Sequence, residues 1–268
     1  MTDNTAFRQP IGFVDSGIGG LPYLKKTRAL LRNECFTYLA DCANFPYGSR
    51  GRDDVELLVT NAVECLVREA EPKLVVVACN TASVVSLDTL RSRFSVPFVG
   101  VVPAIKPAAE QKPGGRIGVL ATERTTSDPY IAELALKYGR NSQIVPVPAP
   151  GLVEAIENGG GHLTGETVRC VADAVAALIS ARVETVVLGC THFVHVRDEL
   201  ERGLGKIPVH DSVDGVAKQV VRVNTDLPGD AGCRGDVLLA TGDRALNGQY
   251  GEISARYGMS LRWCDARD

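Results

Sequence analysis

The sequence predicts an α/β protein of two pseudo-symmetric lobes, each a parallel sheet flanked by helices, with the active site in the cleft between the lobes. Short apolar runs alternate with longer segments of helical spacing, which is the pattern of β-α-β units. The order of elements then recurs: IGFVDS at residue 11 is echoed by IGVLAT at residue 117, and ACNT with Cys79 by GCTH with Cys190. A chain of 268 residues is long enough for two lobes of this kind.

Eight short apolar runs are expected to be strands, because they are bounded by glycine, aspartate or serine. The runs are Ile11–Val14, Phe36–Ala40, Leu74–Ala78, Phe98–Val101, Ile117–Leu120, Ile144–Val147, Thr185–Leu188 and Ile207–His210. Four segments between them place apolar residues at intervals of three and four, as amphipathic helices do. The segments are Asp53–Ala70, Ser83–Phe94, Pro129–Tyr138 and Gly165–Ala181. This alternation indicates parallel sheets covered by helices.

The repeat divides the chain into two lobes joined by a linker near Pro103–Pro113. The segment DVLLATGD at 236–243 needs a neighbouring strand, so the chain should return to the first lobe after Asp211. We therefore expect a first lobe of residues 1–102 plus 215–268 on the Cys79 side. The second lobe should comprise residues 103–214 on the Cys190 side.

Composition and charge favour a soluble protein with a small-molecule substrate. The net charge of −3 argues against a nucleic-acid partner, which needs a basic surface. The N-terminus lacks a basic segment followed by an apolar one, and no run approaches 18 apolar residues, so we expect a cytoplasmic protein without a membrane partner. The eight cysteines form no C-x-x-C pair and should be free thiols in that compartment.

Two cysteines stand where chemistry is expected. Ligands of open parallel sheets bind beyond the carboxyl ends of the strands, so Cys79 and Cys190 should face each other across one cleft. Inverting a stereocentre with an acidic C–H requires a proton to leave one face of the carbon and another to return to the opposite face. A thiol, with an ordinary pKa of about 8.5, suits both steps. A single cysteine after a strand is more often a small buried hydrophobe, but the matched placement favours a catalytic pair.

Polar residues follow both cysteines, with Asn80 and Thr81 after the first and Thr191 and His192 after the second. Such residues are ordinary helix N-caps, yet the same positions aim N–H groups and hydroxyls at an anion such as a substrate carboxylate. His192 is also placed to adjust Cys190.

The turn DSGIGGL, at 15–21, should bring Asp15 and Ser16 to the cleft, where Asp15 can bind a substrate ammonium or tune Cys79. A dinucleotide fingerprint is the competing interpretation of this turn, and Asp41 about twenty residues later favours it. However, Pro22 stands where the third glycine of that motif should be.

Other chemistries find less support in the sequence. Cys190, His192 and His195 form C-x-H-x-x-H, but no clear carboxylate completes a metal site. No lysine occupies a strand-end motif, so pyridoxal phosphate is not indicated and we expect neither cofactor nor metal. A two-lobed amino-acid-binding module without chemistry and a metal-dependent hydrolase remain as alternatives.

Several motifs together resemble those of the glutamate racemases, in the aspartate/glutamate racemase superfamily. They are FVDSGIGGL, YLADCANFPYGSR, VVVACNTAS, GVVPAIKPA, GVLATERT and VVLGCTHF, with a weaker LLATGD. The resemblance implies cofactor-independent conversion of L-glutamate to D-glutamate for peptidoglycan, often by a homodimer. It also implies that Cys79 and Cys190 are the acid/base residues and that Asp15, Glu154 and His192 assist them. The implied substrate-binding residues are Asp15, Ser16, Pro46, Tyr47, Gly48, Asn80, Thr81, Thr125, Thr191 and His192.

The chain departs from the usual racemase pattern in a few places. Val194 stands where a proline is usual, and the segment before Glu154 reads PAPGLVE where a cysteine-proline pair is common. Aspartate racemases of the superfamily typically carry a glutamate at the position of His192, so the resemblance favours glutamate over aspartate as the substrate.

Overall fold

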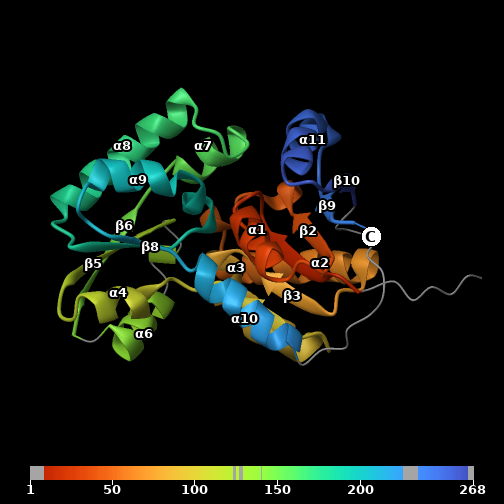
Figure 1. The fold of residues 1–268 in the computed structure, drawn as a ribbon, viewed down its shortest axis with the longest axis horizontal. Coiled ribbons are helices and arrows are strands. Elements are labelled where there is room, and N and C mark those ends of the chain that lie inside the picture. The colour runs from red at the N-terminus through yellow and green to blue at the C-terminus, as the bar shows by residue number, and fades with distance from the viewer. Residues whose placement is uncertain (1–8, 123–124, 127–128, 140, 226–234, 265–268) are drawn as a thin grey trace, which may run out of the picture.

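Ten strands form two parallel sheets in the computed structural model, which describes residues 9–122, 125–126, 129–139, 141–225 and 235–264. The strands are β1 Ile11–Asp15, β2 Phe36–Ala40, β3 Leu74–Val77, β4 Phe98–Gly100, β5 Arg116–Ala121, β6 Gln143–Pro148, β7 Thr185–Leu188, β8 Val209–His210, β9 Val237–Ala240 and β10 Ser260–Trp263. The first sheet has the order β10-β9-β2-β1-β3-β4 and the second has the order β6-β5-β7-β8. The two sheets lie in separate parts of the molecule, side by side (Figure 1).

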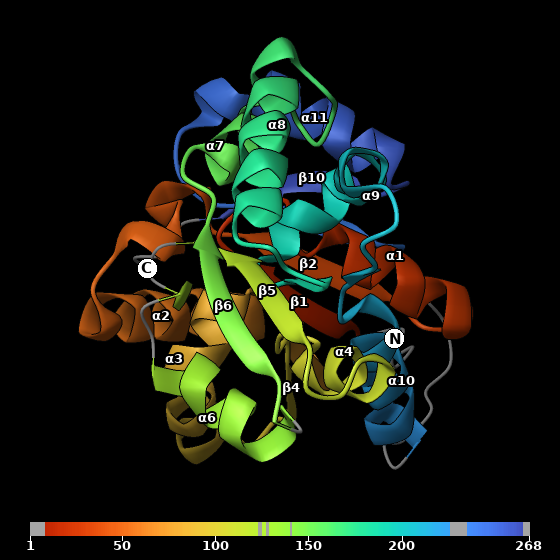
Figure 2. The same cartoon turned by 90° about the vertical axis from the view of Figure 1, so that its left-hand side faces the viewer.

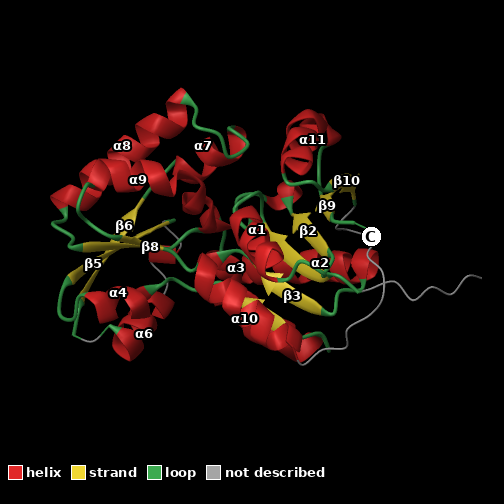
Figure 3. Ribbon diagram, in the orientation of Figure 1, coloured by secondary structure: helices red, strands yellow, loops and turns green. Residues whose placement is uncertain are grey.

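Helices cover both sheets, so the strands lie inside and the helices outside (Figure 3). The helices are α1 Leu21–Leu30, α2 Arg52–Ala70, α3 Asn80–Arg93, α4 Ile105–Gln111, α6 Pro129–Tyr138, α7 Leu152–Asn158, α8 Gly165–Ser180, α9 Arg197–Leu204, α10 Val213–Thr225 and α11 Asn247–Arg256. Short 3-10 turns are η1 Cys42–Asn44, η2 Tyr47–Ser49, η3 Thr191–Val196 and η4 Arg244–Leu246. Figure 2 shows β5 and β6 alongside each other, with α8 above them and α4 and α6 below.

Alternate residues of the strands enter different hydrophobic clusters. Phe13 and Tyr38 belong to one cluster, whereas their neighbours Val14 and Leu39 belong to another. A parallel sheet is normally buried on both faces in this way, and its strands then read as continuous apolar runs. The cluster of Phe13 also includes Leu188 of the second sheet, so one hydrophobic core extends from the first sheet to the second.

The fold class predicted from the sequence is confirmed, since both sheets are parallel and flanked by helices. All eight predicted strands are present, although the eighth is shortened to Val209–His210. The segment 236–243 contains β9, which pairs with β2, and the chain then adds β10, a strand that the sequence analysis did not predict. Helix α3 begins at Asn80, three residues earlier than expected, so its first turn follows Cys79 directly.

Within the described ranges, every helix falls short of the length and apolar character that a membrane crossing requires.

Candidate active site

Cys79 and Cys190 occupy equivalent positions in the two sheets. Each comes two residues after the last paired residue of its strand, β3 or β7, and directly before the first turn of α3 or η3. Their backbones agree closely, with φ −128° and ψ 129° at Cys79 and φ −136° and ψ 135° at Cys190. Each residue is 8% exposed. The repeated sequence therefore builds the same thiol-bearing strand end twice.

The environment of Cys79 favours the protonated thiol. Burial raises the pKa of Cys79 well above its ordinary value, and the neighbouring carboxylate of Asp15 adds to this effect. The backbone N–H groups of Ala82 and Thr81 act in the opposite direction. A negative charge on Cys190 also raises the pKa of Cys79, so the two sulfurs lie within electrostatic reach of each other.

Asp15, at the end of β1, connects the first sheet with residues that follow the second. Its carboxylate accepts hydrogen bonds from Gly17 N at 3.2 Å and from Thr191 Oγ1 at 3.1 Å. Asp15 is fully buried, and burial raises its pKa to about 6 although the positive charge of His192 lowers it. At pH 7 the protein thus holds a buried carboxylate beside Cys79.

We expect Asp15→Asn to stabilise the protein at pH 7 by about 3 kcal/mol while lowering its activity. A carboxyl whose pKa is higher in the folded state than in the unfolded state opposes folding once it ionises. That cost is full above about pH 6 and disappears as the pH falls below about 4, through the two pKa values of Asp15. Urea unfolding of wild type and variant between pH 4 and pH 7.5 measures the difference. A stability gap that does not shrink at low pH would contradict the assignment.

A second buried carboxylate, Glu157 of α7, holds His192. The His192 Nε2 and Glu157 Oε2 atoms are 2.8 Å apart, and Glu157 also accepts hydrogen bonds from Ile18 N and the Tyr250 hydroxyl. Burial alone would raise the pKa of Glu157, but the hydrogen bond and charge of His192 outweigh it and lower that pKa. Glu157 is therefore ionised at neutral pH.

His192 carries the positive charge that matches this carboxylate. Burial lowers its pKa, but hydrogen bonds to Cys190 and Glu157 outweigh burial and raise the pKa well above its ordinary value. An imidazolium at this position faces Cys190 on one side and Glu157 on the other. The two cysteines thus have different neighbours, a carboxylate at Cys79 and a paired imidazolium at Cys190.

The glycines of the DSGIGGL turn allow these groups to come together. A Cβ atom on Gly17 would collide with the Glu157 carboxylate, and one on Gly19 would collide with the His192 ring and the Thr191 hydroxyl. The glycines therefore allow side chains from the part of the molecule with the second sheet to approach this turn closely, a role that needs no bound dinucleotide.

Near Cys79, hydrogen bonds between threonine hydroxyls connect helix α3 with the segment that follows β5. Thr81 Oγ1 lies 3.1 Å from Thr125 Oγ1, which in turn accepts a hydrogen bond from Thr122 Oγ1 at 3.1 Å. Asn80 is 2% exposed, and neither its amide nitrogen nor its amide oxygen has a partner among the described residues. A buried amide with free donors and acceptors beside Cys79 is suited to bind a polar ligand.

The remaining predicted residues lie in two groups. Ser16 and Tyr47 are buried, and Tyr47 donates a hydrogen bond to Asp41 Oδ2 at 2.6 Å. Pro46, Gly48 and Glu154 line a small pocket of about 170 Å³ whose lining includes neither cysteine.

Glu154 is exposed, whereas Glu157, three residues later, binds His192. The sequence analysis missed Glu157. Helical periodicity gave a usable signal, because Glu157 lies four residues after the buried Val153, while Glu154 and Asn158 share the exposed face of α7.

The two histidines of the C-x-H-x-x-H segment, His192 and His195, have different hydrogen-bond partners. His195 Nε2 bonds with the Ile18 carbonyl oxygen at 3.1 Å, away from the His192–Glu157 pair, and burial lowers the pKa of His195 to about 4. Across the described ranges, no three side chains of His, Cys, Asp or Glu are grouped so as to hold a metal ion.

Comparisons with known proteins identify the class of enzyme. Residues 19–220 match the family model of the Asp/Glu/Hydantoin racemases, and the chain belongs to that family. As the motifs predicted, it is an amino-acid racemase.

Named relatives and solved structures are more specific. A glutamate racemase of Herpetosiphon aurantiacus is 42% identical over 217 residues, covering 80% of this chain and 84% of the relative. One from Sphingopyxis alaskensis is 40% identical over 221 residues, covering 80% and 81%. The crystal structure of Escherichia coli glutamate racemase with L-glutamate and the activator UDP-MurNAc-ala matches with a TM-score of 0.88 at 31% identity, covering 96% of this chain and 99% of that one.

Proposed function

We propose that this enzyme interconverts L-glutamate and D-glutamate without a cofactor, with Cys79 and Cys190 acting on opposite faces of the substrate Cα. The glutamate racemases at 42% and 40% identity support glutamate as the substrate. The observation that carries the proposal is the matched pair of cysteines, each beginning a helical turn at the end of a strand, within electrostatic reach of the other.

Two thiols suffice for the proposed reaction. One sulfur, as thiolate, removes the Cα proton, and the other, as thiol, returns a proton to the opposite face. The roles are exchanged in the reverse direction. Asp15 assists Cys79, and the imidazolium of His192 stabilises negative charge on Cys190 and on the substrate. We assign the carboxylate that orients His192 to Glu157 in place of Glu154, because Glu157 makes that hydrogen bond.

We propose that the substrate lies between the lobe of residues 1–102 plus 215–268 and the lobe of residues 103–214. The unpartnered amide of Asn80 and the hydroxyl groups of Thr81 and Thr191 are suited to hold its carboxylates. The wider proposed set is Asp15, Ser16, Pro46, Tyr47, Gly48, Asn80, Thr81, Thr125, Thr191 and His192.

We propose a cytoplasmic enzyme whose D-glutamate enters peptidoglycan, without a nucleic-acid or membrane partner. A homodimer stays a prediction that sedimentation would test.

The direct test uses metal-stripped protein and L-glutamate in deuterated water. D-glutamate should form with deuterium at Cα, because each inversion takes the new proton from a solvent-exchanged thiol. A protein that only binds amino acids would be stabilised by glutamate without isotope exchange. Folded protein that neither racemises glutamate nor exchanges its Cα proton would reject the proposal, and turnover of aspartate alone in the same assay would reassign the substrate.

A further inference from the structure

A pair of thiols outside the proposed active site lies where helix α2 meets the end of strand β10. The Sγ atoms of Cys65 and Cys264 are 3.2 Å apart, in hydrogen-bonding contact. We infer that Cys65 and Cys264 form a peroxide-sensitive dithiol, which closes into a disulfide that fastens the last strand of the first sheet to α2.

The cysteines of the described ranges differ in state. Cys35 is disulfide-bonded, so the expectation of free thiols throughout is wrong there. The free thiols are Cys42, Cys65, Cys79, Cys170, Cys190 and Cys264. Among these six, Cys65 and Cys264 have their sulfur atoms in contact. A disulfide has an S–S length of about 2.05 Å, so closing it requires the two sulfurs to approach by about 1 Å.

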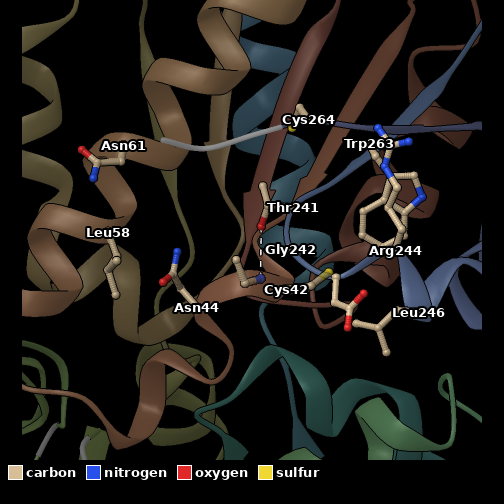
Figure 4. A pocket seen from close by; sticks show the side chains of 12 residues that line it. Cys42, Asn44, Leu58, Asn61, Thr241, Gly242, Arg244, Leu246, Trp263 and Cys264 are labelled. Carbon is tan, nitrogen blue, oxygen red and sulfur yellow. Dashed lines mark hydrogen bonds between the residues drawn. The ribbon is translucent and has the colours of Figure 1, made fainter. Parts of the chain in front are cut away.

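An oxidant can reach this pair from solvent. Cys65 is buried, but Cys264 is partly exposed and lines a pocket of about 870 Å³. Figure 4 shows Cys264 beside Trp263, and the polar side chains of Asn44, Asn61 and Arg244 line the same pocket. Hydrogen peroxide is little larger than water and fits such an opening.

The charges around the pair favour a thiolate. The Cys264 thiol, as a hydrogen-bond donor, lowers the pKa of Cys65 against the effect of burial, and the Arg68 guanidinium, 3.7 Å from the Cys65 sulfur, adds to the lowering. The hydrogen bond with Cys65 and burial raise the pKa of Cys264 well above its ordinary value, so Cys264 keeps the proton of the pair. The negative charge therefore lies on Cys65, whose sulfur is 3.2 Å from that of Cys264 in the lining of the pocket.

The chemistry balances with hydrogen peroxide as the oxidant. The Cys65 thiolate attacks one oxygen of a peroxide that enters through the pocket, the O–O bond breaks, and the departing hydroxide takes a proton and becomes water. Cys65 is now a sulfenic acid. The Cys264 sulfur attacks the sulfur of Cys65, the S–S bond forms, and the sulfenic oxygen leaves as a second water with the proton of Cys264. Two thiols have lost two electrons to one peroxide.

The test treats the full-length protein with an equimolar amount of hydrogen peroxide and maps its peptides without reduction. We expect a linked peptide pair containing Cys65 and Cys264, lighter by two hydrogens and released by dithiothreitol. The bond would close a loop of 199 residues. The oxidised protein should therefore melt about 5–10 °C higher than the reduced protein.

Two serine variants make the result specific. Cys264→Ser should lose both the linked peptide and the rise in melting temperature, whereas Cys42→Ser, at another cysteine of the same pocket, should keep both. A bond between Cys42 and Cys264, or single oxidation of Cys65 or Cys264 to sulfinic acid without a linked pair, would overturn the inference. Because wild-type protein alone yields the peptide map, a variant that fails to fold leaves the test decisive.

Discussion

Cys79→Ala and Cys190→Ala should each lower the rate of glutamate racemisation by about 10³-fold or more. Each substitution removes one of the two groups that we propose to exchange protons with the substrate, and a positioned acid or base alone contributes about 10²–10⁴-fold. Chiral chromatography of L- and D-glutamate after incubation measures the rate. Both sulfurs are nearly buried, so circular dichroism should first establish that the variants are folded.

Isotope exchange separates the roles of the two cysteines. A variant with one remaining thiol can still remove the Cα proton from the enantiomer whose C–H faces that thiol, and can return deuterium to the same face. Cys79→Ala and Cys190→Ala should therefore exchange Cα hydrogen in opposite enantiomers of glutamate. Exchange of the same enantiomer by both variants, or full racemisation by either one, would refute the two-thiol mechanism.

Glu157→Gln should lower kcat by about 10²-fold or more, whereas Glu154→Gln should change it less than about threefold. Glu157 supplies the negative charge that keeps His192 protonated, and the neutral amide would leave a buried imidazolium without its counter-ion. Glu154 lies on the exposed face of the same short helix, so it is a matched control for charge and sequence position.

The pH dependence of Glu157→Gln gives a readout that a purely structural role would not move. Losing the carboxylate should lower the pKa of His192, so the variant should recover part of its activity as the pH is lowered. Steady-state rates from pH 5.5 to pH 9 measure this shift. Equal losses in Glu154→Gln and Glu157→Gln would mean that neither carboxylate acts through His192.

The sequence predicted the fold because the relevant signals are local. Apolar runs end just before Cys79, Cys190 and the turn with Asp15, where polar residues and glycines begin. The structure has strands over these runs and helical turns after them. The repeat further indicated that two cysteines would occupy equivalent positions.

What the sequence left out depends on contacts between distant segments. Glu157 becomes a buried ion-pair partner only because Ile18, His192 and Tyr250 approach it from three other parts of the chain. Strand β10 was missed for a similar reason: its SLRW run has two exposed positions and gains its place by pairing with β9 at the sheet edge. Helical periodicity places Glu157 on the buried face of α7 but does not identify its partners, and the SLRW run has no comparable pattern.

The hydrogen bond from Tyr250 to Glu157 connects helix α11 with the Glu157–His192 pair. The family model ends at residue 220, thirty residues before this tyrosine. The hydroxyl that supports the carboxylate thus comes from beyond the segment that defines the family. A substitution at Tyr250 would therefore act on the protonation of His192 through Glu157, although Tyr250 lies outside the proposed substrate-binding set.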